Sequence, residues 1–122
     1  MDQWDGPNRR KFLRVNYPCL VMIRYSDERK EVLLTHTENL GIGGIGVVLE
    51  KKITTFSPVE LELDLMDLEE HVKCQGKVVW NIKRENANTK QSFYDTGIEF
   101  EGLSPRDSER LIKVIKHLGK FV

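Results

Sequence analysis

A cluster of basic residues near the start of the chain holds the side chains best suited to binding an anion. Residues 9–14 read RRKFLR and include Arg9, Arg10 and Arg14. A guanidinium group is planar and permanently charged, so it can form paired hydrogen bonds with a phosphate and can stack on a flat base. A run of charges is also typical of a solvated basic arm, so the cluster alone leaves both interpretations open.

The second feature with chemical potential is the glycine-rich stretch Asn39–Glu50, which reads NLGIGGIGVVLE. Gly41, Gly43 and Gly46 fit the pattern G-x-G-x-x-G, but this pattern binds a dinucleotide only where the glycines open a helix. The residues after Gly46 are two valines and a leucine, which favour a strand. The stretch therefore predicts a turn or bulge at a strand start, where glycine supplies a positive φ angle.

Catalytic and metal-binding patterns are absent from the sequence. His36, His71 and His117 fall on three different expected elements and form no H-x-x-x-H pair. There is no P-loop, no G-x-S-x-G motif and no zinc-ligand spacing. We therefore expect that the protein is not an enzyme and uses no metal or cofactor.

Composition limits the remaining classes. The 122 residues suit one domain, and the 19 basic residues are balanced by 19 acidic ones. Zero net charge argues against DNA or RNA as a partner, because nucleic-acid surfaces are normally basic. The polar N-terminus is unlike a signal peptide, and no apolar run approaches the roughly 20 residues of a membrane span. We expect a soluble, cytoplasmic protein without membrane insertion, in which Cys19 and Cys74 are buried free thiols.

Apolar residues with a period of two predict strands through most of the chain. In Val59–Leu65 the apolar residues alternate with Glu60, Glu62 and Asp64, which is typical of a sheet with one face in water. The same alternation places Val32, Leu34 and His36 together on one face, and groups Trp80 and Ile82 with the apolar residues Val72, Cys74 and Val78. The expected strands are Tyr17–Tyr25, Glu31–Thr37, Ile45–Glu50, Val59–Leu65, Val72–Ile82 and Phe93–Phe100, with a loop over Lys83–Gln91.

One helix is expected at the end of the chain. Ser104 is a candidate N-cap, Pro105 suits the first helical position, and Gly119 suits the C-terminal stop. The apolar residues at helical spacing are Leu111, Ile115 and Leu118. Six antiparallel strands and one helix, with no βαβ pattern, predict an all-β fold, a small barrel capped by a helix.

The two binding features together resemble the PilZ domain family. Arg10 and Arg14 form R-x-x-x-R before the first strand, and about 25 residues later Asn39, Gly41 and Gly44 fall at the spacing of [D/N]-x-S-x-x-G. The later stretches GKVVW and TGIEFEGLS are also similar to this family, so the resemblance covers about residues 8–118. It implies a six-stranded antiparallel β-barrel of PilZ type with a C-terminal helix.

The resemblance also implies a ligand, the bacterial second messenger cyclic di-GMP. Arg10 and Arg14 would bind its phosphates and stack on guanine, and Arg9 could accompany a stacked ligand pair. The second motif (Asn39, Gly41 and Gly44) would approach a guanine and a phosphate from the barrel surface. Residues 1–8 would form a flexible arm before a single domain over residues 9–122. Ordering of the arm by the ligand would signal to an unidentified protein target.

The sequence departs from the family pattern at Gly41, where serine is usual. A neutral hydrogen bond contributes about 0.5–1.5 kcal/mol, whereas a contact to a charged group contributes about 1.5–3 kcal/mol. The intact arginines should therefore outweigh the missing hydroxyl. Two alternatives remain: a PilZ-like adaptor that binds only protein, and an unrelated small barrel for single-stranded nucleic acid. Zero net charge and few exposed aromatic residues argue against the second.

Overall fold

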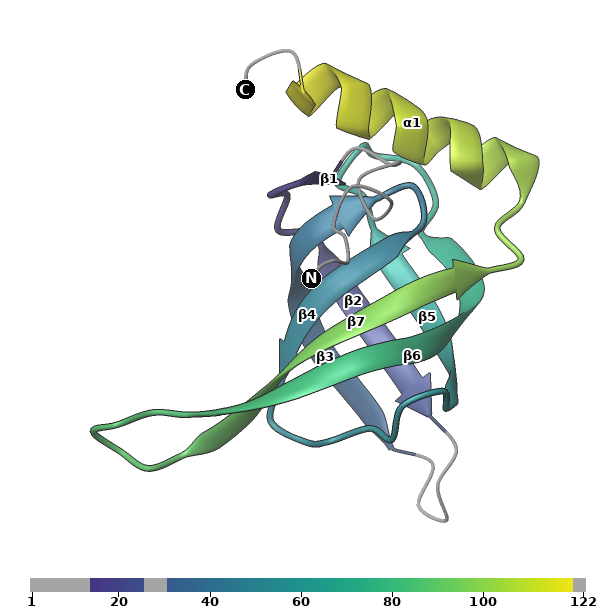
Figure 1. Cartoon of the computed structure of the whole chain (residues 1–122). Coiled ribbons are helices and arrows are strands. Elements are labelled where there is room, and N and C mark those ends of the chain that lie inside the picture. The colour runs from purple at the N-terminus through teal and green to yellow at the C-terminus, as the bar shows by residue number, and fades with distance from the viewer. Residues whose placement is uncertain (1–13, 26–30, 120–122) are drawn as a thin grey trace, which may run out of the picture.

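Seven antiparallel strands and one helix make up the described part of the chain (Figure 1). The computed structural model describes residues 14–25 and 31–119. The elements are β1 (Arg14–Val15), β2 (Leu20–Tyr25), β3 (Val32–Gly41), β4 (Gly44–Leu49), β5 (Pro58–Asp64), β6 (Val72–Glu85), β7 (Ser92–Glu101) and α1 (Pro105–Gly119).

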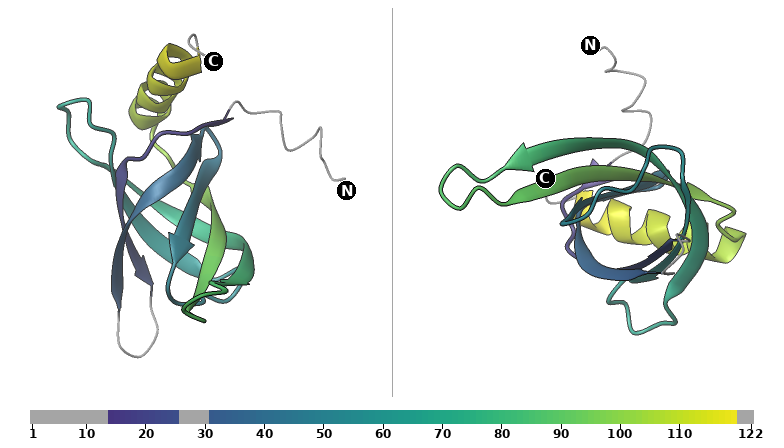
Figure 2. Two further views of the ribbon diagram at one scale, coloured as in Figure 1. Left: turned by 90° about the vertical axis from the view of Figure 1, so that its left-hand side faces the viewer. Right: turned by 90° about the horizontal axis from the view of Figure 1, so that it is seen from below.

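Six of the strands close into a barrel. The strand order is β3-β2-β5-β6-β7-β4, and pairing of β4 with β3 completes the ring, while the two residues of β1 pair with the end of β3. Seen from below in Figure 2, the strands surround the interior and α1 lies across the far end. The predicted all-β fold, a six-stranded antiparallel barrel with a C-terminal helix, is confirmed, with β1 as an additional short strand.

Alternation along β5 builds the core as the sequence predicts. Val59, Leu61 and Leu63 are buried inside the barrel, and the acidic residues between them lie on the outer face. Helix α1 covers the barrel end with the buried Leu111 and Ile115. Its N-cap is confirmed, because the Asp107 N–H donates to the Ser104 hydroxyl at 3.1 Å.

The face of β3 that carries Val32, Leu34 and His36 points to solvent. The inward positions of this strand include Thr35 and Thr37 instead. Thr37 is buried, its hydroxyl donates to the Tyr17 carbonyl, and it accepts from the Cys19 N–H at 3.1 Å. The Thr35 hydroxyl donates to the Val48 carbonyl at 3.2 Å. Because both hydroxyls have backbone partners, threonine is tolerated inside the barrel at these two positions. The apolar residues that alternate with them lie on the outer face.

The loop predicted over residues 83–91 is instead the end of a long hairpin. Strands β6 and β7 stay paired as far as Glu85 and Ser92, and the ribbon projects beyond the barrel in Figure 1. An ion pair between Arg84 and Asp95 links the two strands across the ribbon. The Asn86 side chain accepts hydrogen bonds from two backbone N–H groups of the turn, which closes it in place of a longer loop.

Both cysteines are free, as expected: Cys19 is buried, and Cys74 is partly buried. The described residues contain no helix with the length and apolar character of a transmembrane segment.

Candidate functional site

Arg14 of the first sequence motif meets the second motif where β1 joins the sheet. Arg14 pairs with Gly41 across β1 and β3, and the buried Val15 anchors the short strand beside it. From this position the Arg14 guanidinium reaches along β3, and its Nη1 donates to Asn39 Oδ1 at 2.8 Å. Side chains 25 positions apart are therefore in direct contact on the outer barrel surface. The predicted site residues Arg9 and Arg10 lie outside the described residues.

The glycines of β4 permit close approach rather than a special backbone angle. Asn39 lies opposite Gly46, and a Cβ on Gly46 would sit 2.6 Å from the Asn39 amide nitrogen. A Cβ on Gly44 would overlap the Ile98 carbonyl oxygen of β7. Among the described glycines only Gly102 has a positive φ angle, 74°. The expected positive φ in the glycine stretch is therefore wrong: the glycines sit at the adjoining ends of β3 and β4, where side chains would block close contacts.

The row of close contacts continues across two further strands to Trp80. Gly46 lies opposite Gly97 of β7, and Gly97 lies opposite Trp80 of β6. A Cβ on Gly97 would overlap the Trp80 indole, so the ring lies directly over this glycine. We call Gly46 and Gly97, between the Asn39 amide and the Trp80 indole, the glycine strip. Both glycines are buried, because the Asn39 amide covers Gly46 and the Trp80 indole covers Gly97. The Arg14 guanidinium lies beside Asn39 at one end of this row, and the indole lies at the other.

Sequence reasoning missed Trp80 as a site residue because it placed this residue on the apolar phase of its strand. The register of β6 and β7 shifts between Val78 and Trp80, so one extra residue separates them. Val78 is fully buried, whereas Trp80 and Ile82 are turned outward, with 41% and 51% of their surfaces exposed. The pairing of Gly97 with Trp80 indicates that the indole packs on the outer face, but this pairing can be recognised only when the register of β6 and β7 is known.

This arrangement suits a flat, negatively charged ligand. The absence of Cβ atoms at Gly46 and Gly97 lets the Asn39 amide and the Trp80 indole lie close to the barrel surface. The indole offers a stacking surface, and the guanidinium of Arg14 offers paired donors to an oxyanion. No group of three His, Cys, Asp or Glu side chains in residues 14–25 and 31–119 is placed to hold a metal ion.

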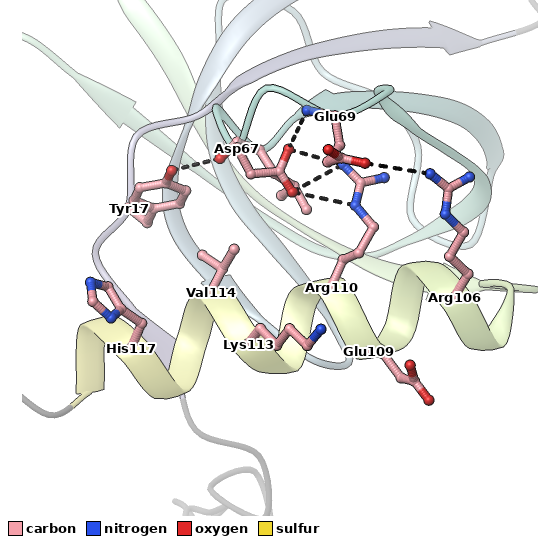
Figure 3. A pocket seen from close by; sticks show the side chains of 10 residues that line it. Tyr17, Asp67, Glu69, Arg106, Glu109, Arg110, Lys113, Val114 and His117 are labelled. Carbon is pink, nitrogen blue, oxygen red and sulfur yellow. Dashed lines mark hydrogen bonds and ion pairs between the residues drawn. The ribbon is translucent and has the colours of Figure 1, made fainter.

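A hollow of about 520 Å³ lies away from these residues, between α1, Tyr17 and the loop after β5 (Figure 3). Its charged side chains largely satisfy one another. Arg110 Nη2 donates to both carboxylate oxygens of Asp67 at 3.0 and 3.1 Å, and Arg110 Nη1 donates to Asp107 at 3.1 Å. Burial alone would raise the pKa of Asp67, but the hydrogen bonds from Arg110 and from the Glu69 N–H outweigh it and lower that pKa. The hydrogen bonds of Arg110 at this hollow therefore hold α1 to the loop after β5.

Comparison with known proteins identifies a family and a fold. The family model "PilZ domain" matches residues 8–117. The PilZ domain of YcgR from Escherichia coli, solved with c-di-GMP, has a TM-score of 0.70 at 17% identity, covering 92% of each chain. The inhibitor of motility MotI/DgrA of Bacillus subtilis has a TM-score of 0.72 at 18% identity, covering 89% of this chain.

A third similar structure is the MrkH–c-di-GMP complex of K. pneumonia, with a TM-score of 0.70 at 16% identity over 90% of this chain. The chain spans about half the length of MotI and of MrkH, at 50% and 52%. A search of curated proteins gives no significant match. At these identities the similar structures establish the fold.

Proposed function

The chain belongs to the PilZ domain family, and we propose that it is a receptor for cyclic di-GMP. The contact of Arg14 with Asn39 supports this proposal most strongly, because it joins the two motifs whose residues the resemblance assigns to the ligand. Solved relatives add support: the structures of YcgR and MrkH named above contain c-di-GMP.

In this proposal the phosphates of the ligand lie at the arginine end of the site. Arg14 and Arg10 bind phosphate oxygens, and Arg9 takes part if two ligand molecules stack. Asn39 has two roles: its Oδ1 holds the Arg14 guanidinium at the edge of the strip, and its amide faces a guanine. Gly41, opposite Arg14, contributes no hydroxyl, so the arginines carry most of the affinity.

A guanine lies over the glycine strip in this proposal. The missing Cβ atoms at Gly46 and Gly97 let the Asn39 amide and the Trp80 indole lie close to the sheet, so that a flat base can lie over these two side chains, and Gly44 lets β4 lie close to β7. The Trp80 indole then stacks on the base or packs against its edge. Stacking of a base on an aromatic side chain contributes about 1–3 kcal/mol, which is comparable to one arginine–phosphate contact.

We propose that the protein is not an enzyme and that its output passes through a protein target. A receptor of this kind changes a partner's binding when its ligand binds one conformation of the protein more tightly than another. The alternative is a PilZ-like adaptor that binds protein without nucleotide, and Gly41 in place of serine is the observation that favours it.

Isothermal titration calorimetry with cyclic di-GMP tests the receptor proposal. We expect micromolar or tighter binding to the wild type and at least a tenfold loss for Arg14→Ala, because a hydrogen bond to a charged group contributes about 1.5–3 kcal/mol. Arg24→Ala is the matched control, since Arg24 is an exposed arginine on β2, and it should change affinity less than twofold. Absence of heat for the wild type would overturn the receptor proposal and leave the adaptor.

A further inference from the structure

The outer face of the β2–β3 hairpin is apolar where water-facing strands are normally polar. Leu34 is 75% exposed, Leu20 63% and Val32 47%, and the partly buried Met22 lies between them. The register makes these residues neighbours: Met22 pairs with Leu34, and the flanking residue pairs place Leu20 and Val32 on the same face. We call Leu20, Met22, Val32 and Leu34 the apolar face.

This composition is not a requirement of the fold. Two threonines occupy inward positions of β3, and each has a backbone partner. On the neighbouring strand β5 every outward position of the alternating run is acidic, as solvent exposure favours. Exposed apolar side chains that are contiguous across two strands, rather than single, mark an interaction surface.

Carboxylates border the apolar face along its whole length on one side. Glu60, Glu62 and Asp64 of β5 lie opposite Arg24, Met22 and Leu20 respectively. On β3, Glu38 lies beyond His36 at the Leu20 end of the face and is also exposed. On the outward positions of β2, β3 and β5, which all lie in the described residues, Arg24 is the one lysine or arginine among these four carboxylates.

Two histidines contact carboxylates of this border. His71 Nδ1 lies 2.8 Å from Glu62 and its Nε2 lies 3.7 Å from Asp64, while His36 Nε2 lies 3.1 Å from Glu38. Lys73 also faces Glu62 from β6. The four carboxylates therefore outnumber the two cations, Arg24 and Lys73, that lie beside them around the apolar centre.

We propose that the apolar face docks a basic, amphipathic helix of a protein partner. Apolar side chains of the helix would cover Leu20, Met22 and Leu34, and its lysine or arginine residues would face the carboxylates of β5. In the ring of strands, β2 lies opposite β7, so this surface is on the other side of the barrel from Gly97. The proposal goes beyond the nucleotide site and stands or falls independently of it.

Charge selects this occupant over two others. A second copy of the chain would bring an acidic border toward an acidic border, and like charges facing each other oppose association. An anionic membrane would be repelled by the same carboxylates. A basic amphipathic helix matches both the apolar centre and the sign of the border.

The test uses a fluorescein-labelled helical peptide of leucine and lysine, and a counterpart with glutamate at each lysine position. Fluorescence anisotropy is measured with the full-length protein. We expect the lysine peptide to bind and the glutamate peptide not to bind. Leu34→Ser and Leu20→Ser should each weaken binding by about tenfold, because central apolar contacts carry most of the affinity of an interface. Ile82→Ser, which removes an exposed apolar residue on β6, away from this face, should change it less than twofold.

A second pair of variants tests whether the acidic border contributes to binding. Glu60→Gln should weaken binding of the lysine peptide at low salt, and Glu109→Gln, an exposed glutamate on α1, should not. Cyclic di-GMP titration of Leu34→Ser should match the wild type, which separates this proposal from the receptor. Equal binding of both peptides, equal loss in Ile82→Ser, or a wild-type dimer in sedimentation that Leu34→Ser dissociates would each overturn the proposal.

Discussion

At the scale of single residues, the candidate site depends on glycines, because their lack of a side chain leaves space for neighbouring residues. Gly46 leaves space for the Asn39 amide, and Gly97 leaves space for the Trp80 indole. Asn39 and Trp80 fill these two spaces on the outer side of the sheet, so the glycines shape the candidate site rather than the barrel core. A glycine pattern in the sequence indicates such a place, but it does not tell close approach from a positive φ angle.

Gly97→Ala tests the role of this space. The new Cβ would overlap the indole, and Trp80 would swing outward because its other side is exposed. We expect cyclic di-GMP binding to weaken by about tenfold, since a stacked base contributes about 1–3 kcal/mol. Calorimetry measures the nucleotide affinity, and chemical denaturation measures the stability of the variant.

Gly102→Ala is the matched control for that variant. A Cβ there meets no atom within 4 Å, but the φ angle of 74° disfavours alanine. It should reduce stability by about 1–2 kcal/mol and leave nucleotide affinity unchanged. If Gly102→Ala weakened binding as much as Gly97→Ala, general destabilisation would explain both results and the strip would lose its support.

The cysteines yield a prediction about reactivity. Burial raises the pKa of the Cys74 thiol to about 11, with a further contribution from Asp107, and burial also raises the pKa of Cys19. Since the thiolate is the reactive form, alkylation by iodoacetamide at pH 8 should be about a hundredfold slower in the native protein than in denaturant. Mass spectrometry of timed samples measures the rates. Rapid native labelling of Cys74 would show that its thiol is more exposed than in this structure.

At the scale of elements, helix α1 is held to the loop after β5 by Arg110. This side chain is only 12% exposed and contacts both Asp67 and Asp107. Arg110→Ala should destabilise the fold by about 1–3 kcal/mol, because it leaves two part-buried carboxylates without their cation. Arg106→Ala on the same helix removes an exposed 3.8 Å pair with Glu69 and should cost at most about 0.5 kcal/mol. Equal losses in the two variants, measured by urea denaturation, would contradict this account.

The same ion pair predicts a dependence of stability on pH. The pKa of Asp67 is lowered in the folded state, so the unfolded chain binds its proton more readily. The stability that this group contributes is fully present above its ordinary pKa, and it is lost as the pH falls through the lower folded-state value. Urea denaturation from pH 7 to pH 3 should therefore show the difference between wild type and Arg110→Ala shrinking below about pH 4. A difference that stays constant to pH 3 would contradict this assignment.

Sequence alone was sufficient for the elements whose pattern is regular. The strand β5 and the N-terminus of α1 follow from strict alternation and from a Ser-Pro cap. The extra residue before Trp80 breaks the alternation, so the outward turn of Trp80 and Ile82 could not be read from period two. Likewise, the exposure of Leu34 depends on threonines that satisfy their hydroxyls inside the barrel, which is a property of register.

At the scale of the whole molecule, the barrel carries two different surfaces. Arg14, Asn39 and the glycine strip lie along β1, β3, β4, β7 and β6, and the apolar face lies on β2 and β3. The first could be anticipated from motif spacing, because Arg14 and Asn39 belong to recognisable patterns. Trp80 could not, since only the folded ring brings β6 into the same row.

One measurement tests the central claim that cyclic di-GMP binds over the glycine strip. A titration of ¹⁵N-labelled protein with cyclic di-GMP, followed by NMR, reports on each backbone amide and on the Trp80 indole N–H. We predict large shifts for Gly46, Gly97 and the Trp80 indole, with the amides of Leu20 and Leu34 unchanged. Binding that shifts other residues and leaves the strip unaffected, or no shifts at high ligand concentration, would contradict the claim.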